Sequence, residues 1–138
     1  MALGRNAKVE LIRQVPLFSR CTRKELAEVA SIADEVDLPA DRVLMREGER
    51  GREFFVLLEG SAEVHRNGRR INQLRDGDFF GEIALVSRSV RTATVTTSEP
   101  SRVLVITDQA FRALLDHAPQ IQIRVLEALA DRLAPSTL

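Results

Sequence analysis

The chain has 138 residues, a length that fits one domain with one buried core. Twenty basic and twenty acidic side chains give zero formal net charge, so the composition lacks the basic excess of nucleic-acid-binding domains. No apolar run approaches the about 20 residues that span a bilayer, and no signal-peptide pattern follows Met1. A single cysteine, Cys21, excludes an intramolecular disulfide, and we expect a cytoplasmic location.

Two helices are predicted near the N-terminus, within residues 6–34. The first ends before Pro16, and its apolar side chains recur at near-helical spacing at Val9, Leu11, Ile12 and Val15. The second begins at Thr22-Arg23-Lys24-Glu25, a capping-box pattern in which a hydroxyl and a carboxylate each accept a hydrogen bond from the other residue's amide. Its apolar face predicts a helix that continues to about Asp34.

From residue 35 to residue 107 the apolar pattern changes to a period of two. Short strand-like stretches separated by glycines occur at 43–45, 54–58, 62–64, 71–74, Thr92–Thr97 and Arg102–Ile106. Asn67-Gly68 predicts a tight hairpin because both residue types tolerate positive φ. We therefore predict an antiparallel, jelly-roll-like β-roll.

Two further helices are predicted over residues 108–134. Asp108 suits the N-cap of the first, and Pro119 suits the first position of the second. The junction His117-Ala118-Pro119 is a candidate hinge between them. The predicted fold class is therefore α+β, with N-terminal helices, a β-roll and a C-terminal helix pair in one domain spanning 1–138.

Residues 79–95 contain the side chains and turn best suited to bind a ligand. Gly81 permits close backbone approach, and a helical turn over Glu82–Leu85 would offer free amides to an anion. Arg91 follows ten residues after Gly81, and its guanidinium suits phosphate oxygens. A phosphate would repel Glu82, whereas a sugar hydroxyl would donate a hydrogen bond to it. Together these residues indicate an anionic sugar phosphate as ligand.

This segment resembles the phosphate-binding cassette of the cyclic nucleotide-binding domain family, F-G-E-[LIM]-A-L, a short variable stretch and R-[ATS]-A-[TS]-V. Phe80 to Leu85 and Arg91 to Val95 match that pattern. The resemblance extends over most of the chain and includes Val15-Pro16-Leu17-Phe18, Glu47-Gly48-Glu49, Leu58-Glu59-Gly60 and the final helix pair. One departure is Val90, where the family often has proline.

By matching position, the resemblance assigns ligand contacts to five residues. It implies that Arg91 binds the exocyclic oxygens of the cyclic phosphate, with help from the backbone amides of Ala84 and Thr92. It also implies that Gly81 lets the backbone approach the ribose and that Glu82 accepts a hydrogen bond from the ribose 2′-OH.

The resemblance also implies a pocket for the base and a movement of the C-terminal helices. Candidate base contacts are Val64, Leu74, Phe79 and Arg132. For the three apolar residues, simple packing in the hydrophobic core is an equal alternative. For the arginine, the equal alternative is a cation that the helix dipole favours near the C-terminus of the last helix. Leu85 corresponds to the residue that couples the cassette to the hinge, with Phe111 as its expected partner, and the last helix would close as a lid.

The expected ligand is cAMP, with cGMP as the alternative. The hydroxyl of Thr92 is compatible with both, because family members use this position to contact guanine, phosphate or adenine. The chain has 18 Arg and 2 Lys, a bias that indicates a GC-rich coding sequence and a bacterial source, for which cAMP is the expected messenger.

The predicted function is a non-enzymatic sensor with no metal or cofactor, whose C-terminal helices move when the ligand binds and signal to an effector domain or protein partner. A ligand-free interaction module on the same fold is the alternative. A cupin-type metal enzyme would need clustered ligands, and His65 and His117 lie far apart in the sequence. A DNA-binding regulator would need a helix-turn-helix, and none follows the last helix. Pairing of the first and last helices in a homodimer remains open.

Overall fold

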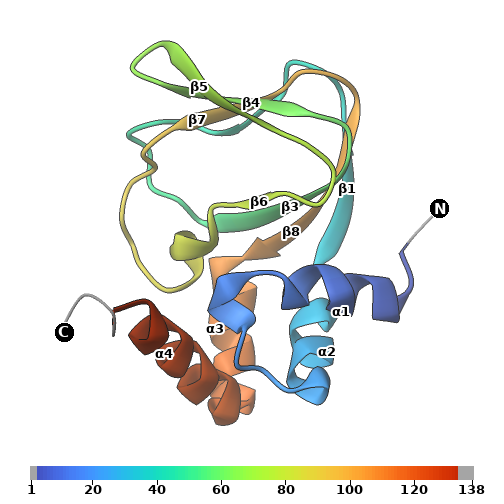
Figure 1. The fold of residues 1–138 in the computed structure, drawn as a ribbon, viewed down its shortest axis with the longest axis vertical. Helices are drawn as coiled ribbons and strands as arrows, with labels where there is room; N and C mark the ends of the chain where they lie inside the picture. Colours follow the sequence, from blue (N-terminus) through green and yellow to red (C-terminus); the bar gives the residue numbers. More distant parts are fainter. Residues whose placement is uncertain (1–2, 134–138) are drawn as a thin grey trace. The chain divides into compact units, whose positions relative to one another are not determined.

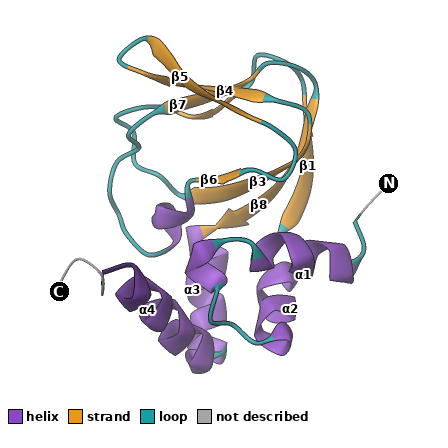
Figure 2. Cartoon of the chain, in the orientation of Figure 1, coloured by secondary structure: helices purple, strands orange, loops and turns teal. Residues whose placement is uncertain are grey.

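The computed structural model describes residues 3–133. The chain forms two compact units. One is helical, comprising the chain up to Ala33 and from Gln109 onward, and the other is the β-unit Asp34–Asp108. Figure 2 shows that the strands all belong to the β-unit.

Within residues 3–133, the helical unit contains one short turn and four α-helices. Their bounds are α1 (Arg5–Arg13), η1 (Pro16–Phe18), α2 (Arg23–Ser31), α3 (Asp108–His117) and α4 (Pro119–Leu133). The capping box is confirmed: the Glu25 amide donates to Thr22 Oγ1 at 3.2 Å, and the Thr22 amide donates to Glu25 Oε1 at 2.8 Å. Pro119 is the first residue of α4 as predicted, whereas Asp108 lies within the first turn of α3.

Aromatic packing and ion pairs join the N-terminal elements to the C-terminal helices within this unit. The rings of Phe18 and Phe111 meet edge to face with centroids 5.8 Å apart, and both side chains are fully buried. The guanidinium of Arg20 donates two hydrogen bonds to Asp131, at 2.7 and 2.8 Å. Among residues 3–133, no helix combines the length and the apolar character that crossing a membrane requires.

The β-unit consists of two four-stranded antiparallel sheets. The strands are β1 (Asp34–Leu38), β2 (Val43–Met45), β3 (Glu53–Glu59), β4 (Ala62–Arg66), β5 (Arg69–Leu74), β6 (Phe79–Phe80), β7 (Thr94–Thr97) and β8 (Ser101–Thr107). Their order is β1-β8-β3-β6 in one sheet and β2-β7-β4-β5 in the other. Figure 1 shows β4, β5 and β7 in one layer and β3, β6 and β8 in the facing layer. This arrangement confirms the predicted antiparallel β-roll.

Side chains from both sheets form the core of the β-unit. Its buried members are Phe55, Leu57, Ala62, Leu74, Phe80, Val95 and Val103. The predicted hairpin is present between β4 and β5, with φ of 53° at Asn67 and 77° at Gly68. Both values lie in the left-handed region that this residue pair tolerates.

Two predicted boundaries were wrong. The helix expected to reach about Asp34 ends at Ser31, and Asp34 instead begins β1, which pairs along its whole length with β8. The strand expected from Thr92 begins at Thr94. The carbonyl of Thr92 accepts a hydrogen bond from Arg66 Nε at 3.0 Å, so this oxygen has a side-chain donor.

Candidate functional site

The turn that follows β6 forms one wall of the site. Pairing of Phe80 with Phe55 of β3 holds the start of the turn against the sheet. Gly81 then adopts φ +81° and caps the 3-10 turn η2 (Glu82–Leu85), which confirms the helical turn expected there. Because most L side chains disfavour this backbone conformation, glycine is strongly favoured where the chain enters the turn.

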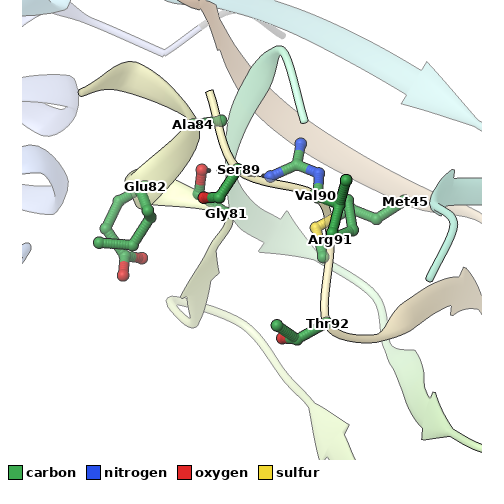
Figure 3. A pocket seen from close by; sticks show the side chains of 9 residues that line it. Met45, Gly81, Glu82, Ala84, Ser89, Val90, Arg91 and Thr92 are labelled. Carbon is green, nitrogen blue, oxygen red and sulfur yellow. Dashed lines mark hydrogen bonds between the residues drawn. The ribbon is translucent and has the colours of Figure 1, made fainter. Parts of the chain in front are cut away.

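A pocket of about 240 Å³ opens between this turn and the segment leading into β7. It is lined by Met45, Gly81, Glu82, Ile83, Ala84, Ser89, Val90, Arg91 and Thr92. The lining residues come from Gly81 and the η2 turn, from the 89–92 segment and, in the case of Met45, from β2. Figure 3 labels all of them except Ile83. The structure therefore brings together all five residues expected to contact phosphate and ribose.

The side chain of Arg91 is the buried cation of this pocket, with only 8% of its surface exposed. Its Nη2 donates to the backbone carbonyl of Glu53 at 2.6 Å, and its Nη1 donates a longer bond to the carbonyl of Gly81 at 3.4 Å. No carboxylate oxygen lies within ion-pair distance of it in the described part of the chain. A guanidinium has five N–H donors, so donors remain for an anion.

Burial and nearby carboxylates shift the pKa of this guanidinium in opposite directions. Removal from water lowers the pKa of Arg91, and the negative charges of Glu53 and Glu82 partly offset that effect. Because an arginine begins from a very high pKa, the side chain keeps its charge at neutral pH. The pocket therefore holds a desolvated positive charge, which favours an anionic ligand.

The backbone around Arg91 is fixed by two other segments. The Arg91 amide donates to the Glu49 carbonyl at 2.7 Å, and the Gly48 amide donates to the Arg91 carbonyl at 2.9 Å. Arg66, in β4, holds the next carbonyl, that of Thr92. Sequence reasoning missed Arg66, because no local pattern connects residues 26 positions apart.

Gly51 is a second residue that sequence reasoning missed. It is buried beside Arg91, and a Cβ placed on it would stand 2.6 Å from both Cζ and Nε of that side chain. A Cβ on Gly81 would stand 2.8 Å from Arg91 Nη1 and 2.9 Å from the Glu53 carbonyl oxygen. The guanidinium therefore lies against two glycine backbones.

The η2 turn presents Glu82 to the pocket but leaves the Ala84 amide engaged. The side chain of Glu82 is half-buried at the first position of the turn and lines the pocket. The Ala84 amide donates to the Gly81 carbonyl at 3.1 Å. A phosphate oxygen would have to share or replace that hydrogen bond.

The candidate base contacts lie elsewhere in the structure. Leu74 belongs to the β-unit core, Val64 packs against that core, and Phe79 meets Phe54 edge to face at 6.3 Å. These three residues are not among those that line the pocket. The side chain of Arg132 lies outside the described residues.

The two residues expected to couple the cassette to the hinge belong to different units. Leu85 is buried in the β-unit and Phe111 is buried in the helical unit. Their coupling stays a prediction. Within residues 3–133, no cluster of three or more His, Cys, Asp and Glu side chains is arranged to hold a metal ion.

Comparison with known proteins identifies the family. The family model described as the cyclic nucleotide-binding domain matches residues 35–118, well over half of the chain. The chain belongs to the cyclic nucleotide-binding domain family. It is thus a cyclic nucleotide-binding sensor domain, and its fold is a regulatory one.

Individual relatives agree with this assignment. The domain is 32% identical over 115 residues to the cAMP-dependent protein kinase regulatory subunit of Mycosarcoma maydis, covering 77% of this chain and 22% of that protein. It is 30% identical over 114 residues to the cGMP-dependent protein kinase egl-4 of Caenorhabditis briggsae, covering 78% of this chain and 15% of that protein. This cyclic nucleotide-binding domain therefore spans less than a quarter of the length of either relative.

A solved structure with a similar fold is the N-terminal domain of a transcriptional regulator from Streptomyces coelicolor A3(2). It superposes with a TM-score of 0.81 at 27% identity, covering 92% of each chain.

Proposed function

We propose that the pocket around Arg91 binds 3′,5′-cyclic AMP. The observation that carries this proposal is the buried guanidinium of Arg91, which lines a pocket and has no carboxylate within ion-pair distance among residues 3–133. A charge-assisted hydrogen bond from this side chain to an exocyclic phosphate oxygen would offset the free-energy cost of burying the guanidinium. The cyclic phosphate then lies between Arg91 and the η2 turn, near the amides of Ala84 and Thr92.

Glu82 supplies the proposed contact to the ribose. Its side chain is half-buried and lines the same pocket, where a phosphate oxygen would repel the carboxylate and a 2′-hydroxyl would donate to it. The pocket volume of about 240 Å³ is below the roughly 300–1,000 Å³ of pockets that enclose a drug-sized ligand. The pocket thus fits the sugar-phosphate part of the ligand, and the base extends beyond it.

The preference for cAMP over cGMP rests on the composition and on one relative. The arginine-rich composition favours a bacterial source, and the relative from Mycosarcoma maydis is named for its dependence on cAMP. The relative from Caenorhabditis briggsae is named for cGMP, and Thr92 lines the pocket with an exposed side chain that suits either base. A cGMP-selective site is therefore the second candidate.

The domain acts in this proposal as a cytoplasmic, non-enzymatic sensor. Ligand phosphate draws the η2 turn inward, Leu85 moves relative to Phe111, and α4 closes over the base. Such a shift needs only a higher affinity of the ligand for one of the two arrangements of the helices. An effector domain or protein partner, of the kind that accompanies such domains in the relatives, would receive the signal.

Calorimetric titration with cAMP, cGMP and non-cyclic 5′-AMP tests the proposal. We expect saturable binding of cAMP, weaker binding of cGMP and much weaker binding of 5′-AMP, whose second phosphate charge and open geometry do not match the pocket. A Thr92→Ala variant titrated with both cyclic nucleotides measures the part that the hydroxyl plays in the preference. Absence of binding by both cyclic nucleotides would leave the ligand-free interaction module as the function.

A further inference from the structure

One row of paired residues crosses the sheet β2-β7-β4-β5 beside the pocket. Met45 pairs with Val95, Val95 pairs with Val64, and Val64 pairs with Asn72 of the edge strand β5. Directly paired residues place their side chains on the same face of a sheet. Met45 lines the pocket, and Val95 belongs to the core of the β-unit. The row therefore leads from the pocket along the inner face of the sheet to Asn72.

The alternation of side chains along β5 also places Asn72 on the inner face. Leu74 is buried in the core of the β-unit, and side chains two positions apart in a strand point to the same face. Gln73, between the two, points to the outer face. Asn72 is exposed although Leu74 is buried, so the inner face is open to solvent at this end of β5.

The exposed amide lies on the side of the pocket where the proposed ligand has its base. Thr92, at the pocket wall, precedes β7 by two residues, and β5 is the second neighbour of β7 in the sheet. Neighbouring strands lie about 4.8 Å apart, so β5 is about 10 Å from β7. Half-buried Val64 lies between them and offers an apolar surface to a purine ring. A base on this surface would bring its outer edge to Asn72.

The amide of Asn72 is oriented and still has hydrogen-bonding capacity. Its Oδ1 accepts from the Gln73 backbone amide at 2.8 Å, and a carbonyl oxygen can accept a second hydrogen bond. Its Nδ2 donates to no acceptor within residues 3–133. One donor group and one acceptor position are therefore available side by side.

We propose that Asn72 is a specificity-determining residue that recognises adenine, with Nδ2 donating to the ring nitrogen N7 and Oδ1 accepting from the N6 amine. This proposal rests on the proposed function. An Asn amide matches this edge of adenine with two hydrogen bonds, whereas guanine presents two acceptors there, N7 and O6. The oxygen O6 would face Oδ1, so the same side chain disfavours cGMP.

Two cAMP analogues test the proposed contacts by calorimetric titration of the intact protein. The first is 7-deaza-cAMP, which lacks the N7 acceptor, and the second is purine riboside 3′,5′-cyclic monophosphate, which lacks the N6 amine. Each should bind roughly 2–12-fold more weakly than cAMP, the effect of one lost hydrogen bond.

Asn72→Leu keeps the approximate size of the side chain and removes both of its hydrogen-bonding groups. In this variant the two analogues should bind as tightly as cAMP, and the preference for cAMP over cGMP should shrink. Gln73→Leu is the matched control, because it makes a similar change on the outer face of the same strand. It should keep all three differences.

Two results would overturn the proposal while leaving cAMP as the ligand. One is equal binding of cAMP and both analogues by the intact protein, which needs no variant to be folded. The other is the persistence of both analogue penalties in Asn72→Leu, which would assign the N6 and N7 contacts to another residue. Absence of cAMP binding by the intact protein is a distinct outcome, and it would refute the proposed function together with this role of Asn72.

Discussion

Arg91 Nη2 donates to the backbone carbonyl of Glu53 at 2.6 Å, which ties the cation of the pocket to the first residue of β3. A backbone carbonyl stabilises the guanidinium through hydrogen bonding without adding a full negative charge. The cation is therefore positioned but not neutralised. This relationship explains how a buried arginine remains available to an anionic ligand.

Replacement of Arg91 by Ala should weaken cAMP binding by about 1.5–3 kcal/mol, roughly 10–150-fold, because a charge-assisted hydrogen bond is removed. Arg91→Lys should recover only a minor part of this loss, since an ammonium cannot donate in a fork to both a carbonyl and a phosphate. Calorimetric titration measures both variants. Unchanged affinity in Arg91→Ala would reject its contact with the phosphate.

The carboxylate of Glu82 should discriminate between ribose and 2′-deoxyribose. In the intact protein, 2′-deoxy-cAMP should bind about 10–150-fold more weakly than cAMP, because a hydrogen bond to a charged group is lost. In Glu82→Ala this difference should shrink toward unity. Glu59→Ala, at the exposed end of β3 and away from the pocket, is the matched control and should keep the full difference. The same 2′-deoxy penalty in Glu82→Ala as in the intact protein would show that Glu82 does not contact the ribose.

The β4–β5 hairpin should depend on the backbone of Gly68 rather than on space around it. A Cβ there would meet nothing within 4 Å, but φ is +77°. Gly68→Ala should therefore lower the free energy of unfolding by about 1–2 kcal/mol, the cost of a left-handed L-residue. Gly68→Asn should cost less, because Asn tolerates this conformation. Urea unfolding of both variants measures the difference, and equal stabilities for the two would contradict the prediction.

The capping box of α2 should make stability depend on acid pH. Burial works to raise the pKa of Glu25, but hydrogen bonds from Thr22 and Arg124 outweigh it, and the net shift is below the usual value of 4.5. A lowered pKa in the folded state means that the unfolded chain binds protons first. This contribution is therefore complete above about pH 4.5 and is lost as the pH falls through the folded-state pKa.

Glu25→Gln removes that titration while an amide at the same position still accepts the hydrogen bond from Thr22. The free energy of unfolding should then fall less between about pH 6 and about pH 3 than it does in the intact protein. Glu28→Gln, on the same helix, is the matched control. An identical acid dependence in Glu25→Gln and the intact protein would rule out a stabilising role for the Glu25 charge.

The sequence alone determined the features that depend on neighbouring residues. The capping box at Thr22 and Glu25, the hairpin at Asn67-Gly68 and the turn after Gly81 each follow from local backbone and hydrogen-bonding preferences. The cassette is also local, since ten residues separate Gly81 from Arg91. These signals, together with the family resemblance of the cassette, were enough to predict the fold class and to name five candidate residues for phosphate and ribose, all of which line the pocket.

The tertiary structure decided what depends on partners far away in the chain. Asp34 begins a strand because β8 offers backbone partners to it, so the helix expected to reach that residue ends earlier. Gly51 lies against the side chain of Arg91, forty positions later. Steric exclusion between such residues exists only after both have been brought together, and no local pattern in the sequence encodes that proximity.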